Sequence, residues 1–152
     1  MRTPRISAQE QRVLRDSAKA ELERMEAYLS DQNTVQMIDE FKNKFNQCET
    51  VYKIVLAEHQ KRKGKAIDGF LKVNMTQVPH ALRFAGYSFN NAMLNELFGA
   101  SSKKGTTVKK LRDAITHGID HSAINEIVAR KEELFGYMDS FLTTIRTFDS
   151  AA

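Results

Sequence analysis

The segment 108–118 contains the residues whose types and spacing best suit chemistry. Asp113 and His117 are four residues apart, so on a helix they share one face and the carboxylate could orient the imidazole. Arg112 and His117 are five apart, which separates them by about 140° around a helix. They could converge on one ligand only through the long arginine side chain or across an interface with a second copy. Gly118 then predicts the end of the helix.

Arginine and histidine without a cluster of metal ligands suit phosphodiester transfer in RNA. A histidine can take the proton from the ribose 2′-hydroxyl or give one to the leaving 5′-oxygen, and an arginine can stabilise charge that develops on phosphorus. Because the 2′-hydroxyl is the nucleophile, RNA would be cut and DNA would not. Nearby basic side chains could bind the RNA backbone electrostatically, and these are Lys103, Lys104, Lys109 and Lys110.

The string from Arg112 to His117, with polar Asp113 after the arginine and Gly118 after the histidine, resembles the R-x(4–6)-H motif of HEPN domains. The resemblance implies a helical bundle with the motif in a late helix. It also implies a metal-independent endoribonuclease of a toxin–antitoxin or phage-defence system, with Arg112 and His117 as the catalytic pair. Asp113 would be the supporting residue, where the family favours asparagine. A homodimer with a composite active site, and an antitoxin or other protein partner, are further expectations from the resemblance.

The same residues also have structural interpretations. Arg112 could pair with a distant glutamate, while Asp113 and His117 could stabilise the ends of their helix. The chain would then be a non-catalytic helical module for dimerisation or protein interaction. A third interpretation is a helical regulator that binds duplex DNA without cleaving it, although no helix-turn-helix spacing supports it. The second basic cluster, at 61–65, could bind nucleic acid or form a solvated helix end.

Histidine and cysteine positions give little support to a metal site. Asp113, His117 and His121 are spaced at i, i+4 and i+8, which would suit a metal on one unbroken helix. A cap at Asp120 predicts that the helix breaks, so we expect no metal and no other cofactor, and His121 becomes a candidate second contact to RNA. The single Cys48 excludes an internal disulfide and falls on a predicted core face.

The composition predicts one mainly helical domain covering residues 1–152. Of these residues 41% are hydrophobic, which is enough for the core of a single globular unit. With 7 glycines and 2 prolines, the chain has few turn residues for a fold of many short strands. The net charge of +4 is mild.

No apolar run approaches the roughly 18 residues of a membrane span, and the N-terminus lacks the apolar core of a secretion signal. We therefore expect a cytoplasmic protein that does not contact membranes.

Apolar spacing indicates where the helices lie. Ser7 followed by Glu10 is a capping pattern that starts the first helix. The segment 65–78 allows only a short helix, because Gly69 and Pro79 limit it. We expect four to six mainly antiparallel helices, with a short helix that carries the motif before a long C-terminal helix. The main helices are predicted at 7–29, 34–63, 77–98 and 107–117, and from Asp120 or Ser122 to about 147.

Overall fold

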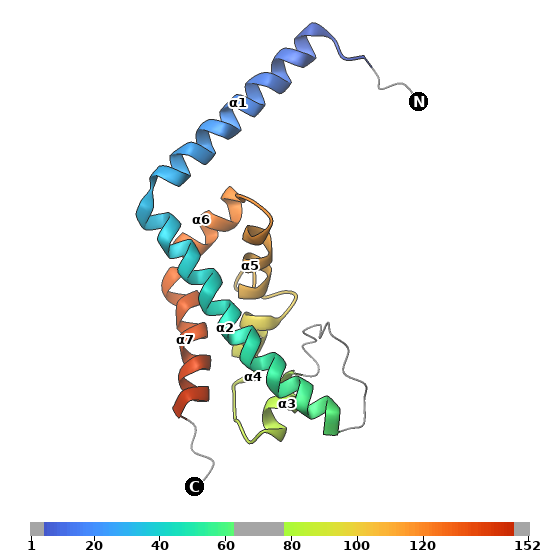
Figure 1. Cartoon of the computed structure of the whole chain (residues 1–152), viewed down its shortest axis with the longest axis vertical. Helices are drawn as coiled ribbons and strands as arrows, with labels where there is room; N and C mark the ends of the chain where they lie inside the picture. Colours follow the sequence, from blue (N-terminus) through green and yellow to red (C-terminus); the bar gives the residue numbers. More distant parts are fainter. Residues whose placement is uncertain (1–4, 63–77, 148–152) are drawn as a thin grey trace. The chain divides into compact units, whose positions relative to one another are not determined.

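The computed structural model describes residues 5–62 and 78–147, which form α-helices without any strand (Figure 1). The all-α class is confirmed, although this part of the chain has seven helices rather than four to six. None of these helices is both long and apolar enough to cross a membrane. The segment 65–77 and its predicted short helix lie outside the described residues. The helices are α1 Ala8–Ser30, α2 Gln32–Arg62, α3 Val78–Phe84, α4 Asn91–Phe98, α5 Val108–Thr116, α6 His121–Ala129 and α7 Lys131–Thr147.

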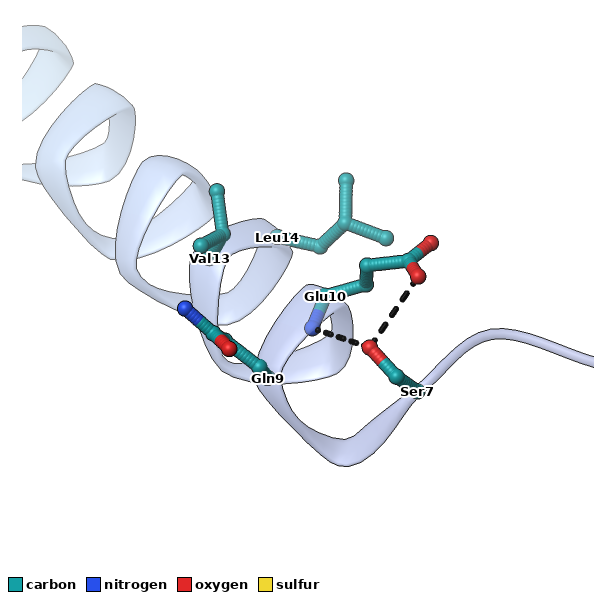
Figure 2. Close-up of a pocket in the computed structure, with 5 residues that line it drawn as sticks. All are labelled: Ser7, Gln9, Glu10, Val13 and Leu14. Atoms are coloured by element: carbon teal, nitrogen blue, oxygen red, sulfur yellow. Dashed lines mark hydrogen bonds between the residues drawn. The ribbon is translucent and has the colours of Figure 1, made fainter.

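The chain divides into two compact units, Met1–Met37 and Ile38–Ala152. In the first unit, α1 begins after Ser7, whose Oγ accepts a hydrogen bond from the Glu10 backbone N–H at 3.1 Å (Figure 2). The same hydroxyl donates to the Glu10 carboxylate at 3.0 Å, so the predicted capping pattern is confirmed. The second unit contains the segment with the candidate site, and the single domain 1–152 stays a prediction.

The core of the second unit forms around the apolar stripe of α2. Phe98 of α4 joins three helices, because its ring lies 5.2 Å from that of Tyr52 in α2 and 5.5 Å from that of Phe141 in α7. Such aromatic contacts bury large apolar areas and fix the helices against one another. Helical spacing from Ile38 through Tyr52 predicts Val55 as the next core residue, but Leu56 is buried in its place. The buried members of the stripe are Ile38, Phe41, Phe45, Cys48, Tyr52, Leu56 and His59.

The single helix predicted at 77–98 was wrong, because the chain forms α3 and α4 with a turn between them. At the end of α3, the Gly86 backbone N–H bonds the Arg83 carbonyl and the Tyr87 N–H bonds the Leu82 carbonyl. This arrangement requires a left-handed residue, and Gly86 has a φ of 94°. Asn90 then caps α4 by accepting hydrogen bonds from two backbone N–H groups. Both signals are visible in the sequence.

The single C-terminal helix was also wrong, since α6 and α7 are separate. Asp120 caps α6 as predicted, accepting a hydrogen bond from the Ala123 backbone N–H at 3.0 Å. The helix then breaks at Arg130, which has φ −108° and ψ 20°. The Arg130 side chain bonds the carbonyl of Thr106, which belongs to the loop before α5. The motif-bearing helix is therefore followed by the short α6 and only then by the longer α7.

Two glycine substitutions should change stability in opposite directions. Gly86→Ala places a Cβ on left-handed backbone and should lower the free energy of unfolding by about 1–2 kcal/mol. Gly136→Ala adds a Cβ in α7 with no atom within 4 Å, so it should raise that free energy by about 0.5–1 kcal/mol. Urea denaturation of the full chain measures both values. Equal effects of the two substitutions would contradict the described turn.

Candidate functional site

The short helix α5 is held by its cap and by one buried face. Thr107, which is fully buried, accepts a hydrogen bond from the Lys110 backbone N–H and donates one to the Gly99 carbonyl at 2.8 Å. The buried face comprises Val108, Leu111 and Ile115, and α5 packs on α4 and α6. Because these residues recur at helical spacing, the polar side chains of α5 must lie on its other face.

Arg112 connects α5 to α2 through several contacts. Its guanidinium binds both carboxylate oxygens of Glu49, at 3.1 and 3.4 Å, and donates to the Asn46 side-chain oxygen at 2.7 Å. It also lies 4.6 Å above the ring of Phe45. The Arg112 and Glu49 side chains are only 16% and 14% exposed, so solvent screens this pair weakly. The distant glutamate that the structural interpretation expected is therefore Glu49.

His117 and Asp113 are not brought together in the described structure. His117 is the C-cap of α5 and is exposed. The Asp113 carboxylate instead accepts hydrogen bonds from Arg112 at 2.9 Å and from Lys109 at 3.3 Å. Asp113 thus helps to fix the arginine, while His117 remains accessible at the end of the helix. After it, Gly118 has a φ of 152°, which favours glycine.

The predicted RNA-binding residues differ in their surroundings. Lys103, Lys104 and Lys110 are exposed, whereas Lys109 is half-buried against Asp113. His121, the first residue of α6, is half-buried. In residues 5–62 and 78–147, no group of three or more histidine, cysteine or acidic side chains is arranged to hold a metal ion. The exposed lysines are therefore the cations of this region that a ligand can reach most directly.

Sequence reasoning missed a second network that fixes the loop before α5. Arg130 donates to the Thr106 carbonyl at 2.7 Å and to the Glu126 carboxylate at 2.5 Å, and its Nε bonds Glu133 at 3.2 Å. Glu126 in turn accepts a hydrogen bond from the Thr106 backbone N–H at 2.9 Å. Spacings of i, i+4 and i, i+3 around Arg130 could have indicated the ion pairs, but not the contact with Thr106.

Ionisation in this network favours the charged carboxylates. Burial opposes ionisation of Glu126, but hydrogen bonds from Thr106 and Arg130 outweigh it and lower the pKa of Glu126. Hydrogen bonds from Arg130 and Tyr137 lower the pKa of Glu133. Burial and the bond to Glu133 raise the pKa of Tyr137 to about 12. The loop is therefore anchored by charges that persist at neutral pH.

Cys48 is a core residue, as its position on the α2 stripe predicted. Its side chain is completely buried, and its Sγ lies 3.8 Å from the Met138 carbonyl oxygen. Burial raises the pKa of the Cys48 thiol to about 12. Because the thiolate is the reactive form, Cys48 is unsuited to act as a nucleophile at neutral pH.

The comparisons with known proteins leave the site as the sole guide to function. No protein-family model, curated protein or solved structure matches the chain. The resemblance to HEPN domains rests on residues 112–118 and on the helical architecture. Function must therefore be argued from what the residues around α5 can do.

The Arg112–Glu49 pair should contribute measurably to stability. A double-mutant cycle with Arg112→Met and Glu49→Gln should give a coupling energy of about 1–3 kcal/mol, because the hydrogen bonds are charged and partly buried. Lys42→Met removes an exposed pair with Asp39 and should change the free energy of unfolding by less than about 0.5 kcal/mol. A coupling energy no larger than the effect of this control would contradict the described contact.

The network around Arg130 should make stability depend on pH. Glu126 and Glu133 have folded pKa values below the ordinary 4.5, so their stabilisation is present above the unfolded pKa and is lost as the pH falls through the folded values. We expect the free energy of unfolding to fall between about pH 5 and pH 3 less in Arg130→Met than in the wild type. Urea titrations at each pH test this. Lys131→Met, an exposed neighbour, should keep the wild-type slope.

Proposed function

We propose that this chain is a metal-independent endoribonuclease in which His117 transfers protons and Arg112 stabilises the reacting phosphate. The observation that carries the proposal is an exposed histidine at the end of the same short helix as an arginine that is already held in place. His117 lies about 7.5 Å along the helix axis from Arg112. Glu49 and Asn46 fix the guanidinium, so little reorganisation is needed when charge develops on a bound phosphate.

The proposed reaction is attack by the ribose 2′-oxygen on the adjacent phosphorus. The P–O5′ bond breaks, which leaves a 2′,3′-cyclic phosphate on one fragment and a 5′-hydroxyl on the other. One base removes the 2′-hydroxyl proton, and one acid protonates the leaving oxygen. His117 is suited to one of these transfers. The resemblance to HEPN domains supports a homodimer in which the His117 of a second copy carries out the other.

Asp113 is the more exposed of the two carboxylates that bind Arg112, and we propose that a phosphate replaces it. Its side chain is 43% exposed, whereas Glu49 is 14% exposed. A phosphate at the outer edge of the guanidinium would displace Asp113, while Glu49 continues to hold the arginine from the α2 side. The exposed residues Lys103, Lys104 and Lys110 would bind neighbouring phosphates. We extend the proposal to a toxin–antitoxin or phage-defence context, which the HEPN resemblance supports.

A non-catalytic interaction module is the second candidate function. The observation that favours it is the bonding of Arg112, whose guanidinium makes four hydrogen bonds to side chains of the same chain. In this second candidate, Arg112 would serve solely to attach α5 to α2. In this case His117 would be an exposed helix cap, and substitution of either residue would leave RNA intact.

The two candidates differ in their effect on RNA in the presence of EDTA. The wild type should cleave labelled RNA pools and leave 2′,3′-cyclic phosphate ends, and it should not cleave 2′-O-methyl RNA or DNA of the same sequence. His117→Ala should slow cleavage by about a hundredfold or more. His80→Ala removes an exposed histidine from α3 and should keep the wild-type rate.

The enzyme proposal fails if the wild type cleaves no more RNA than His117→Ala across several RNA pools. Circular dichroism of each variant shows whether the helices are retained, so that a loss of folding is not mistaken for a loss of activity. Intact RNA with all variants folded would favour the interaction module.

A further inference from the structure

The helix α1 presents an apolar stripe that its own unit does not bury. It is 23 residues long, and none of its residues is buried. Leu22 and Leu29 are 51% and 53% exposed, and Val13 and Leu14 at the start of the helix are also exposed (Figure 2). Most of the stability of a helix in a protein comes from packing of its apolar face, so an unburied apolar stripe is a candidate contact surface. The stripe comprises Leu14, Ala18, Leu22, Met25 and Leu29.

The charges of α1 are distributed unequally along its length. Residues 12–19 contain three basic side chains and one acidic one, whereas residues 20–31 contain four acidic side chains and one basic one. In an antiparallel pair, Lys19 of the basic half can lie beside Glu26 in the acidic half of the second copy, which is an opposite-charge pair. A parallel pair would instead set Glu21 against Glu26 of the second copy, which is repulsive. Charge complementarity thus favours a second copy in antiparallel orientation.

We propose that α1 binds α1 of a second copy as an antiparallel helix pair. If Leu22 and Met25 occupy the a and d positions of a heptad, Ala18 and Leu29 take the neighbouring d and a positions. In one register Leu22 packs against Met25 of the second copy, and Ala18 packs against its Leu29. The same register puts Lys19 beside Glu26 of the second copy, twice in each dimer.

This pairing involves residues of α1 alone. It uses no residue of α5 and does not depend on RNA cleavage. In this register, pairing would bury Leu22 and Leu29 of both copies at once. The proposal therefore predicts a dimer of the full chain whether or not the protein is an enzyme.

Charge exchange at the interface tests the proposal by sedimentation velocity of the full chain. Lys19→Glu and Glu26→Lys each create two like-charge pairs and should each weaken dimerisation by about tenfold. Combining them restores opposite charges and should return the wild-type affinity. Glu23→Lys makes the same charge change on the outer face of the helix and should have no effect. Leu22→Asp should weaken dimerisation more than either charge substitution and keep its helical circular dichroism.

Disulfide trapping tests the register. The double variant Ala18→Cys/Leu29→Cys should form a disulfide-linked dimer on oxidation, since the two positions face each other between copies. Ala18→Cys alone should not, because its counterpart is 11 residues away along the helix, about 16 Å. A monomeric wild type would overturn the proposal, and so would a dimer whose affinity Leu22→Asp leaves unchanged. Packing of α1 on the rest of its own chain would show as a monomer in every variant.

Discussion

The contact of Arg112 with Glu49 and Phe45 is the interaction on which the arrangement of the site depends. A helix of nine residues has little stability alone, so α5 needs partners to stay in place. Its apolar face packs on α4 and α6, but this packing does not involve its polar face. Arg112 supplies that connection by pairing with a glutamate 63 residues earlier in the chain, on the central helix α2.

The loop before α5 is fixed by a second set of charges. Thr107 bonds the Gly99 carbonyl, and Arg130 bonds the Thr106 carbonyl while two glutamates hold the arginine. The start and the middle of α5 are therefore constrained, and His117 lies exposed at its end. The same bonds that fix Arg112 also compete with a phosphate for its guanidinium. The site is catalytic if a phosphate can replace one of these partners of Arg112, and it is structural if the partners keep the guanidinium fully bonded.

Much of this architecture could be predicted from local sequence, and the errors have physical reasons. The apolar spacing of α2 predicted the central core face, and the caps at Ser7 and Asp120 predicted two helix starts. The turn at Gly86 was missed although its glycine was visible, since helical spacing continued across it. No glycine or proline marks the break at Arg130. The Arg130 side chain bonds the Thr106 carbonyl there, and local sequence does not reveal such a tertiary contact. Glu49 was unpredictable for the same reason, as spacing within one helix carries no information about a residue on another.

The central claim is that RNA is bound at α5, where His117 is exposed at the end of the helix and Arg112 is held about one and a half turns before it. Heteronuclear NMR of the full chain with a 2′-O-methyl RNA tests it most directly, because the blocked hydroxyl cannot attack and the complex persists. The account predicts that the largest chemical-shift changes occur at His117, at Gly118 and at the Arg112 Nε–H. Unchanged spectra, or changes confined to α3 and α7, would contradict it.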